Sequence, residues 1–130
     1  LEMHAHKWPH MFPGGMRQRV SIASAFATNP ELLLCDEPFS ALDELTGAKL
    51  REEFRRLVKG THKTGVFITH SILEAIEIGD RILVFRVPGC VSAEFIVSEA
   101  LKQFGRDGLK QRILNEMANG TSEQESATVE

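Results

Sequence analysis

The chain has 130 residues, 42% hydrophobic and 25% charged, which is the balance of one globular domain at most. Its formal net charge of −3 comes from the last eleven residues, where Glu123, Glu125 and Glu130 occur without a basic residue and leave 15 acidic against 15 basic residues. This neutral body lacks the basic footprint of a nucleic-acid-binding protein. No apolar run reaches the roughly 18 residues of a membrane span. Two cysteines, Cys35 and Cys90, make no disulfide framework, so we expect a reducing, cytosolic environment.

A Gly-Gly turn precedes the first predicted helix. After residues 12–15 (FPGG), apolar residues recur at helical spacing, at Met16, Val20, Ala23 and Ala27. Asn29-Pro30 cannot continue a helix, so we expect it to end near Thr28. Paired glycines at a helix N-terminus leave backbone N–H groups unobstructed at the positive end of the dipole, which suits a phosphate. Such pairs are also common turn chemistry, so this pattern alone leaves both interpretations open.

The next segment is an apolar run that ends in two acids. Residues 32–35 (LLLC) predict a buried strand, which Asp36, Glu37 and Pro38 follow. Open α/β sheets bind their ligands at the carboxyl edge of the strands. One carboxylate there can hold a hydrated Mg²⁺, and its neighbour can orient or deprotonate a water. Taken alone, the segment fits equally well a buried strand that exits through solvated acids.

A second helix and a second strand follow. Asp43 suits the N-cap of a helix that reaches Lys59 and is closed by Gly60. We expect a buried stripe on this helix at Leu50, Phe54, Leu57 and Val58, and a solvated face at Arg51, Glu52, Arg55 and Arg56. Residues 65–69 (GVFIT) then predict a strand, and His70 comes directly after it. If the two strands are parallel neighbours, His70 shares an edge with Asp36 and Glu37; a lone histidine is also an ordinary loop residue.

The rest of the chain is predicted as a helix, a hairpin and C-terminal helices. Ser71 and Glu74 match a capping box, so a helix begins after His70 and stops at Gly79. Strands at 81–85 and 90–97 flank a Pro-Gly turn, which indicates an antiparallel pair. Residues 98–118 have an amphipathic helical pattern. The order of elements gives an α/β fold with a mostly parallel sheet and flanking helices.

Four segments resemble the motifs of ABC-type ATPases. Residues 12–20 (FPGGMRQRV) are similar to the signature motif, 33–38 (LLCDEP) to the Walker B motif, 40–43 (SALD) to the D-loop, and 68–70 (ITH) to the switch histidine. Their order and spacing agree with the family from about residue 7 to about residue 97. Residues 36–46 and 69–75, with Pro88-Gly89, are further similar to the nitrate, sulfonate and taurine class of importers.

The resemblance implies a P-loop NTPase-like fold, present here as the C-terminal half of a nucleotide-binding domain. We expect this partial domain at residues 1–97, a helical extension at 98–119 and a disordered acidic tail at 120–130.

The resemblance also implies a role for each motif residue. Asp36 would hold Mg²⁺ through water, Glu37 would polarise the attacking water, and His70 would touch the γ-phosphate of ATP. The signature turn acts on the ATP of a second ATPase subunit and comprises Pro13, Gly14, Gly15 and Met16. Asp43 would cross the interface between the two subunits.

Two departures from the family pattern limit these roles. The phosphate cradle G-x-x-x-x-G-K-[ST] does not occur in the 130 residues, so we expect no activity from the chain alone. Because the sequence opens on Leu1, we also expect it to be part of a longer protein. Pro13 stands where the family has a serine, and the proline removes both a hydroxyl and an N–H donor. Losing such a donor costs about 1.5–3 kcal/mol.

The leading hypothesis is therefore an ATP-hydrolysing subunit of an ABC importer, inactive alone, that works with ATP and Mg²⁺. Its expected partners are a second ATPase subunit and transmembrane permease subunits, without nucleic acid, at the cytoplasmic face of the cell membrane. An alternative is a non-catalytic module that docks on an intact ABC ATPase and presents the altered signature turn to its ATP. A third is an ABC-type ATPase acting on DNA, which the neutral body disfavours.

Overall fold

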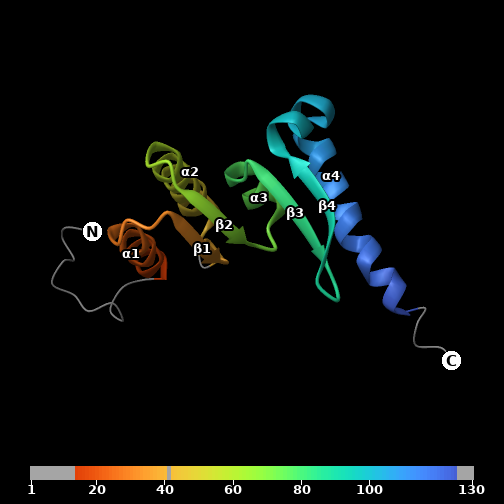
Figure 1. Cartoon of the computed structure of the whole chain (residues 1–130), viewed down its shortest axis with the longest axis horizontal. Helices are drawn as coiled ribbons and strands as arrows, with labels where there is room; N and C mark the ends of the chain where they lie inside the picture. Colours follow the sequence, from red (N-terminus) through yellow and green to blue (C-terminus); the bar gives the residue numbers. More distant parts are fainter. Residues whose placement is uncertain (1–13, 41, 126–130) are drawn as a thin grey trace. The chain divides into compact units, whose positions relative to one another are not determined.

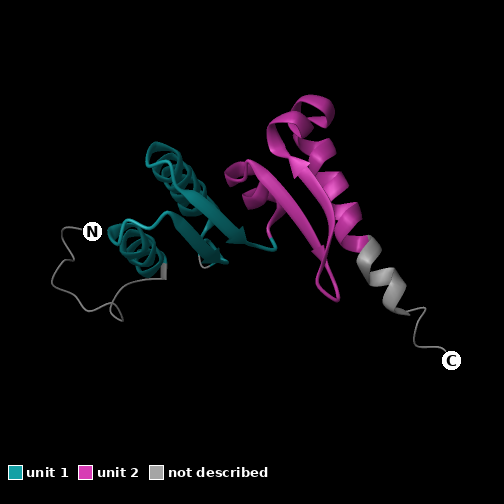
Figure 2. Ribbon diagram, in the orientation of Figure 1, with its two compact units in different colours: residues 1–70 teal, residues 71–130 magenta. Residues whose placement is uncertain are grey.

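The computed structural model describes residues 14–40 and 42–125, with side chains described up to Ala118. The chain divides into two compact units, residues 1–70 and 71–130 (Figure 2). Each unit has its own two-stranded sheet, one parallel and one antiparallel. The strands therefore lie in two sheets rather than in one mostly parallel sheet, although both predicted pairings are confirmed.

The first unit holds two helices and a parallel strand pair. Its elements are α1 (Gly14–Ala27), β1 (Leu32–Asp36), α2 (Glu44–Gly60) and β2 (Thr64–Ile68) (Figure 1). The register runs from Leu32 opposite Thr64 to Asp36 opposite Ile68, so both strands end at the same edge. Lys63 fixes the start of the pair, because its ammonium donates to Asn29 Oδ1 at 2.8 Å and to the Pro30 carbonyl at 2.6 Å.

Phe54 is the centre of the core of this unit. Its side chain is 1% exposed and contacts the rings of Phe26, Phe39 and Phe67 edge to face, with centroids 4.9 to 6.1 Å apart. These four rings come from α1, the turn after β1, α2 and β2. Both helices therefore pack on the sheet face that carries Phe67, and the end of β1 is tied to the same core.

The opposite face of the β1–β2 sheet is apolar and exposed. Leu34 is 73% exposed and Ile68 is 64% exposed, and Leu32 and Val66 beside them are about half exposed. Alternation along a strand sends every second side chain to the same face, so these four form one surface. We name it the bare sheet face. Contiguous exposed apolar surface of this kind is uncommon on soluble proteins.

The burial of α2 departs from the predicted stripe at two positions. Leu50 and Phe54 are buried as expected, but Leu57 is 46% exposed. Arg51, predicted on the solvated face, is 4% exposed, and its guanidinium pairs with Glu44 Oε1 at 2.8 Å. Gly47, one turn before Arg51, makes room for this guanidinium, since a methyl group added there would lie 3.0 Å from Nη1. Gly60 is the last helical residue, and Thr61 rather than Gly60 is the C-cap.

The second unit packs a short helix and a long helix on a hairpin. Its elements are α3 (Ile72–Ile78), β3 (Arg81–Arg86), β4 (Cys90–Ile96) and α4 (Val97–Glu125). Ser71 caps α3 by accepting a hydrogen bond from the Glu74 N–H, and Gly79 closes it, both as predicted. The buried core comes from α3, β3 and α4, with Ala93 and Phe95 of β4 packed against it. It comprises Ile76, Ile82, Val84, Val97, Ala100, Leu109 and Ile113.

Helix α4 is interrupted at Gly105, whose φ of 69° and ψ of 178° are not helical. Two ion pairs fix the part after Gly105 to the rest of the unit: Arg106 to Glu77 at 2.6 Å, and Arg86 to Glu116 at 3.0 Å. The helix reaches Glu125, which gives backbone structure to the first residues of the segment predicted as a tail, and residues 126–130 lie outside the described residues. Within the described part of the chain, no helix combines the length and the hydropathy that a membrane span requires.

Candidate functional site

The backbone turns sharply where β1 ends. Asp36 is the last residue of the strand, and Glu37 has a φ of 45°, in the left-handed region that non-glycine residues rarely occupy. The Glu37 N–H continues the ladder by donating to the Ile68 carbonyl at 2.9 Å. The Glu37 carbonyl accepts from the N–H and the hydroxyl of Ser40, at 3.3 and 3.0 Å. Glu37 is therefore held on both sides of its Cα atom, as residues in such conformations usually are at functional sites.

The Glu37 carboxylate contacts His70, which follows the neighbouring strand. Its Oε1 accepts the backbone N–H of His70 at 3.0 Å and lies 2.6 Å from Nδ1 of the imidazole. The Glu37 side chain is 33% exposed and that of His70 is 79% exposed. The structure thus brings together two residues that the sequence predicted at one sheet edge. A positioned carboxylate in contact with an imidazole can accept a proton and share it with the ring.

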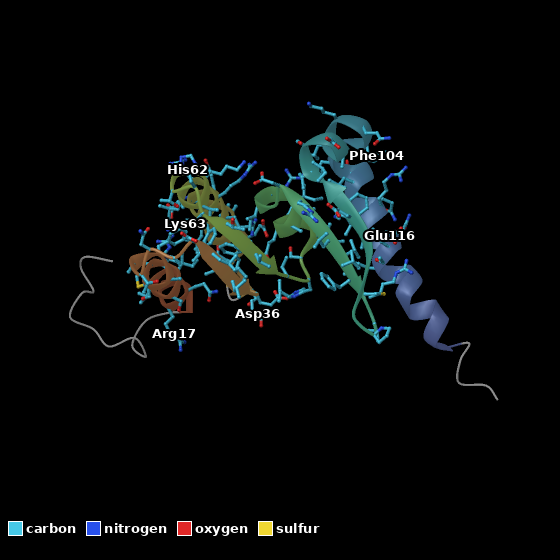
Figure 3. All side chains as sticks on the ribbon, in the orientation of Figure 1. Arg17, Asp36, His62, Lys63, Phe104 and Glu116 are labelled. Carbon is cyan, nitrogen blue, oxygen red and sulfur yellow. The ribbon has the colours of Figure 1, made fainter. Side chains whose placement is uncertain are left out.

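Asp36 presents its carboxylate to solvent at the end of β1 (Figure 3). It is opposite Ile68 in the register and shares a strand face with Leu34. Mg²⁺ characteristically takes one or two protein carboxylates and completes its shell with phosphate oxygens and water. Asp36 fits such a donor set as a single protein ligand. No group of three or more His, Cys, Asp and Glu side chains suited to a metal ion occurs among the residues whose placement is described.

The N-terminal turn of α1 is held against the loop that follows β1. Gln18 donates from Nε2 to the Pro38 carbonyl, and a methyl group added at Gly15 would lie 3.1 Å from Cδ2 of Leu42. Gly14 is the first helical residue and Met16 is half-buried. Pro13 lies outside the described residues. The contacts of this part of α1 therefore run to Pro38 and Leu42, both in the loop that follows Glu37.

Asp43 is the N-cap of α2, as predicted. Its side-chain Oδ1 accepts the Thr46 N–H at 3.0 Å, and its backbone is extended. The carboxylate is exposed, and the hydrogen bond from the Thr46 N–H is the main cause that lowers the pKa of Asp43 below its ordinary value. Asp43 thus stays charged at the entrance to α2, where a negative charge also favours the helix dipole.

Cys35 and Cys90 form no disulfide, in agreement with the sequence. Cys35 is half-buried on the covered face of β1, and its burial raises the pKa of the thiol above the ordinary cysteine value. A raised pKa keeps the thiol neutral and unreactive. Cys35 therefore packs in the core side of the sheet rather than contributing a nucleophile.

Three residues of this region were not found from the sequence: Gln18, Leu42 and Arg51. Gln18 and Leu42 each contact a segment that is distant in sequence. Arg51 lies on the buried face of α2, where its charge led us to predict a solvated position. Some signal existed for Arg51, because Gly47 and Arg51 are one helical turn apart on the same side as Phe54. For Gln18 and Leu42 the sequence carried no pattern beyond the motifs themselves.

The sequence was compared with protein families and with curated proteins. A family model described as ABC transporter matches residues 2–40. The taurine import ATP-binding protein of Rhizobium johnstonii is 45% identical over 109 residues, which cover 83% of this chain and 41% of that protein. The choline transport ATP-binding protein of Bacillus subtilis is 48% identical over 80 residues, 62% of this chain and 21% of that protein. The nitrate import ATP-binding protein of Synechococcus elongatus is 46% identical over 83 residues, 64% and 13% of the two chains.

The chain is similar to the ABC transporter family over residues 2–40 and to an ATP-binding protein of taurine import over most of its length. Its relatives are ATP-binding subunits of importers, which agrees with the importer class that the motifs resemble. The chain spans less than half the length of the relatives named here.

A solved structure supports the fold of this chain. It is a dimeric, post-hydrolysis state of an ATP-binding cassette bound to ADP and Pi, with a TM-score of 0.66 and 38% identity over 75% of this chain and 41% of that one. The α/β, P-loop NTPase-like fold predicted from the sequence is therefore confirmed.

Proposed function

We propose that this chain is part of an ATP-binding subunit of an ABC importer and supplies the strand edge at which ATP is hydrolysed. The observation that carries the proposal is the pairing of Glu37 with His70 at the shared carboxyl edge of β1 and β2, directly beside Asp36. Relatives named as ATP-binding proteins of taurine, nitrate and choline transport support the same function. The similar cassette structure is bound to ADP and Pi, which supports nucleotide as the ligand.

Glu37 and His70 act as one unit in this proposal. Glu37 polarises the water that attacks the γ-phosphate, and the 2.6 Å contact orients the carboxylate through the imidazole. His70, with most of its side chain exposed, is available to touch the γ-phosphate. The hydrogen bond from the His70 N–H holds Glu37 at the edge even when the ring turns toward a phosphate. Hydrolysis therefore requires no large displacement of either backbone.

Asp36 is the residue that would hold Mg²⁺, through water. When bound, the ion neutralises charge on the phosphate oxygens of ATP. Asp36 is exposed and lies one residue before Glu37, so the metal ligand and the water-polarising group occupy adjacent positions of one rigid strand end. This spacing keeps the two carboxylates in separate roles.

The signature turn and Asp43 act across an interface in this proposal. Gly14, Gly15 and Met16 form the first turn of a 14-residue helix, whose N–H groups suit the phosphates of an ATP bound by a second ATPase subunit. Pro13 contributes neither a hydroxyl nor an N–H, so the turn binds that ATP less tightly than a serine-containing turn. Asp43 reaches the same interface as a charged helix cap. The dimeric state of the similar cassette supports this arrangement.

The partners follow from the same proposal. They are a second ATP-binding subunit and the transmembrane permease subunits of an importer, at the cytoplasmic face of the membrane. The chain alone is inactive, because its sequence holds no G-x-x-x-x-G-K-[ST] cradle for the triphosphate.

Reconstitution tests the proposal. The chain is co-produced with a separate polypeptide that carries a G-x-x-x-x-G-K-[ST] cradle, and ATP hydrolysis is measured with Mg²⁺. We expect turnover by the pair and none by the chain alone, with Glu37→Gln lowering turnover at least about a hundredfold. Glu52→Gln is the control, because Glu52 is an exposed carboxylate on α2 that pairs with Arg56. A pair that binds ATP without hydrolysing it, or hydrolysis that Glu37→Gln leaves intact, would contradict the proposal.

A second candidate is a non-catalytic module that docks on an intact ABC ATPase. The Gly-Gly start of α1 favours it, because this turn can cap another subunit's ATP without any cradle in the chain itself. The discriminating measurement is association with an intact ABC ATPase, with and without ATP. ATP-dependent association that survives Glu37→Gln, without added hydrolysis, favours the module over the enzyme.

A further inference from the structure

Leu42 lies between two glycines that belong to different helices. Its Cδ2 would be 3.1 Å from a methyl group added at Gly15, in the first turn of α1, and its Cβ would be 3.8 Å from one added at Gly47, in α2. Contacts of 3.0–3.4 Å are tighter than nine in ten that real Cβ atoms make. The absence of a side chain at Gly15 is therefore what lets the leucine approach the backbone of α1.

Leu42 is itself anchored to the core of the first unit. Its N–H donates to the Phe39 carbonyl at 3.2 Å, and Phe39 is 2% exposed and packs edge to face on Phe54. On its other side the chain passes directly to Asp43, whose carbonyl accepts the Gly47 N–H at 2.8 Å. Leu42 therefore connects three features: the aromatic core, the first turn of α1 and the cap of α2.

We infer that Leu42 is a positioning residue that holds the Gly14-Gly15 turn and the Asp43 cap at a fixed separation, by packing between Gly15 and Gly47. The inference rests on the proposed function for its importance, since it joins the two elements assigned to the subunit interface. A displacement of the Gly14-Gly15 turn by a partner's nucleotide then reaches Asp43 through the Leu42 side chain. Ordinary core packing alone does not require that coupling.

A double-mutant cycle on the full chain tests the inference without nucleotide. Gly15→Ala places a methyl group against Leu42, although alanine is itself a better helix former than glycine. We expect Gly15→Ala to speed amide exchange at Thr46, which donates to Asp43, by about tenfold, the loss expected for a weakened hydrogen bond. Exchange at Leu34 in β1 changes less than at Thr46, which separates loosening of the cap from unfolding of the unit.

Shortening Leu42 should reverse the effect. Leu42→Val removes a methylene group, so Gly15→Ala combined with Leu42→Val restores slow exchange at Thr46. Gly60→Ala is the matched control, because a methyl group there meets nothing within 4 Å, and it leaves Thr46 unchanged.

Two outcomes overturn the inference. The first is an unchanged Thr46 amide in Gly15→Ala, and the second is an equal effect of Gly15→Ala with Leu42 and with Val at position 42. Where Gly15→Ala destabilises the whole unit, Leu42→Ala supplies the comparison, because it removes Cδ2 and leaves Gly15 untouched: faster exchange at Thr46 supports the inference and unchanged exchange overturns it. Because no nucleotide is used, failure here is distinct from failure of the reconstituted ATPase.

Discussion

Glu37 has an uncommon backbone conformation, and one oxygen of its carboxylate contacts two groups of His70. Its φ of 45° turns the chain out of β1, and Oε1 meets both the N–H and the Nδ1 of His70. A residue that leaves a strand in the left-handed region points its side chain differently from the alternation of the strand. This explains how two adjacent acids, Asp36 and Glu37, reach different surroundings, one in solvent and one against the histidine.

Asp43 gives a prediction about pH at the residue scale. The Thr46 N–H lowers the pKa of this aspartate in the folded chain, so the unfolded chain binds the proton more readily. Its contribution to stability is present above the ordinary aspartate value of about 3.9 and is lost as the pH falls through the lowered folded value. We expect the stability of the wild type relative to Asp43→Asn to be constant above about pH 4 and to shrink below it.

The measurement is the urea midpoint of both proteins over a series of acidic and neutral pH values. Asparagine keeps an oxygen that can cap α2, so the comparison isolates the charge. A difference between the two proteins that grows on acidification contradicts the assignment of this cap.

The strand edge that carries Asp36, Glu37 and His70 was predictable, but the contacts around it were not. Asp36, Glu37 and His70 could be placed together because each follows a short β-rich run, and parallel neighbours end at one edge. The contacts of Gln18 and Leu42 depend on how α1 packs against a loop 20 or more residues away in sequence, which no local periodicity predicts. The half-buried Phe26 is a related case, because the predicted stripe of α1 included Ala23 and Ala27, which are exposed.

At the scale of elements, Phe54 decides how α2 is held. Its ring contacts α1, the turn after β1 and β2, so one side chain joins four segments. We expect Phe54→Ala to cost about 3–5 kcal/mol of unfolding free energy, from lost burial and the cavity left behind. Urea unfolding followed by circular dichroism gives the value.

Phe85→Ala is the matched control for this prediction. The Phe85 side chain is 64% exposed on β3, and its removal should change stability by no more than about 0.5 kcal/mol. Equal effects of the two substitutions, or a cost below about 1 kcal/mol for Phe54→Ala, would show that the aromatic cluster does not carry the unit.

Periodicity predicted the elements better than it predicted their faces. The helix over α2 was placed within a residue at each end, because Asp43 caps it and the turn at Thr61 and His62 closes it. Its buried side shifted from Leu57 toward Arg51 since Gly47 leaves space for a long side chain and Glu44 neutralises it. The prediction for Arg51 was wrong because it relied on the charge alone, whereas the aliphatic part of an arginine side chain can pack like an apolar residue.

At the scale of the whole molecule, β1 has the composition of a strand buried on both faces. Near-continuous apolar runs are typical of parallel sheets covered by helices on both sides. The described residues cover the face of Leu33 and Phe67, while Leu34 on the other face is 73% exposed. The composition of β1 therefore indicates a second layer over the face of Leu34, which the described residues do not supply. This agrees with a chain that spans only part of the length of its relatives.

The bare sheet face leads to a prediction of self-association. Exposed contiguous apolar surface and unpaired strand edges favour contacts between copies of a chain. We expect the molar mass of the wild type to rise with concentration in size-exclusion chromatography with light scattering. Leu34→Lys places a charge in the centre of this face and should shift the chain toward monomer, whereas Leu45→Lys, at a 79% exposed position of α2, should not. A wild type that stays monomeric at all concentrations and melts cooperatively would show that the bare sheet face is tolerated in water.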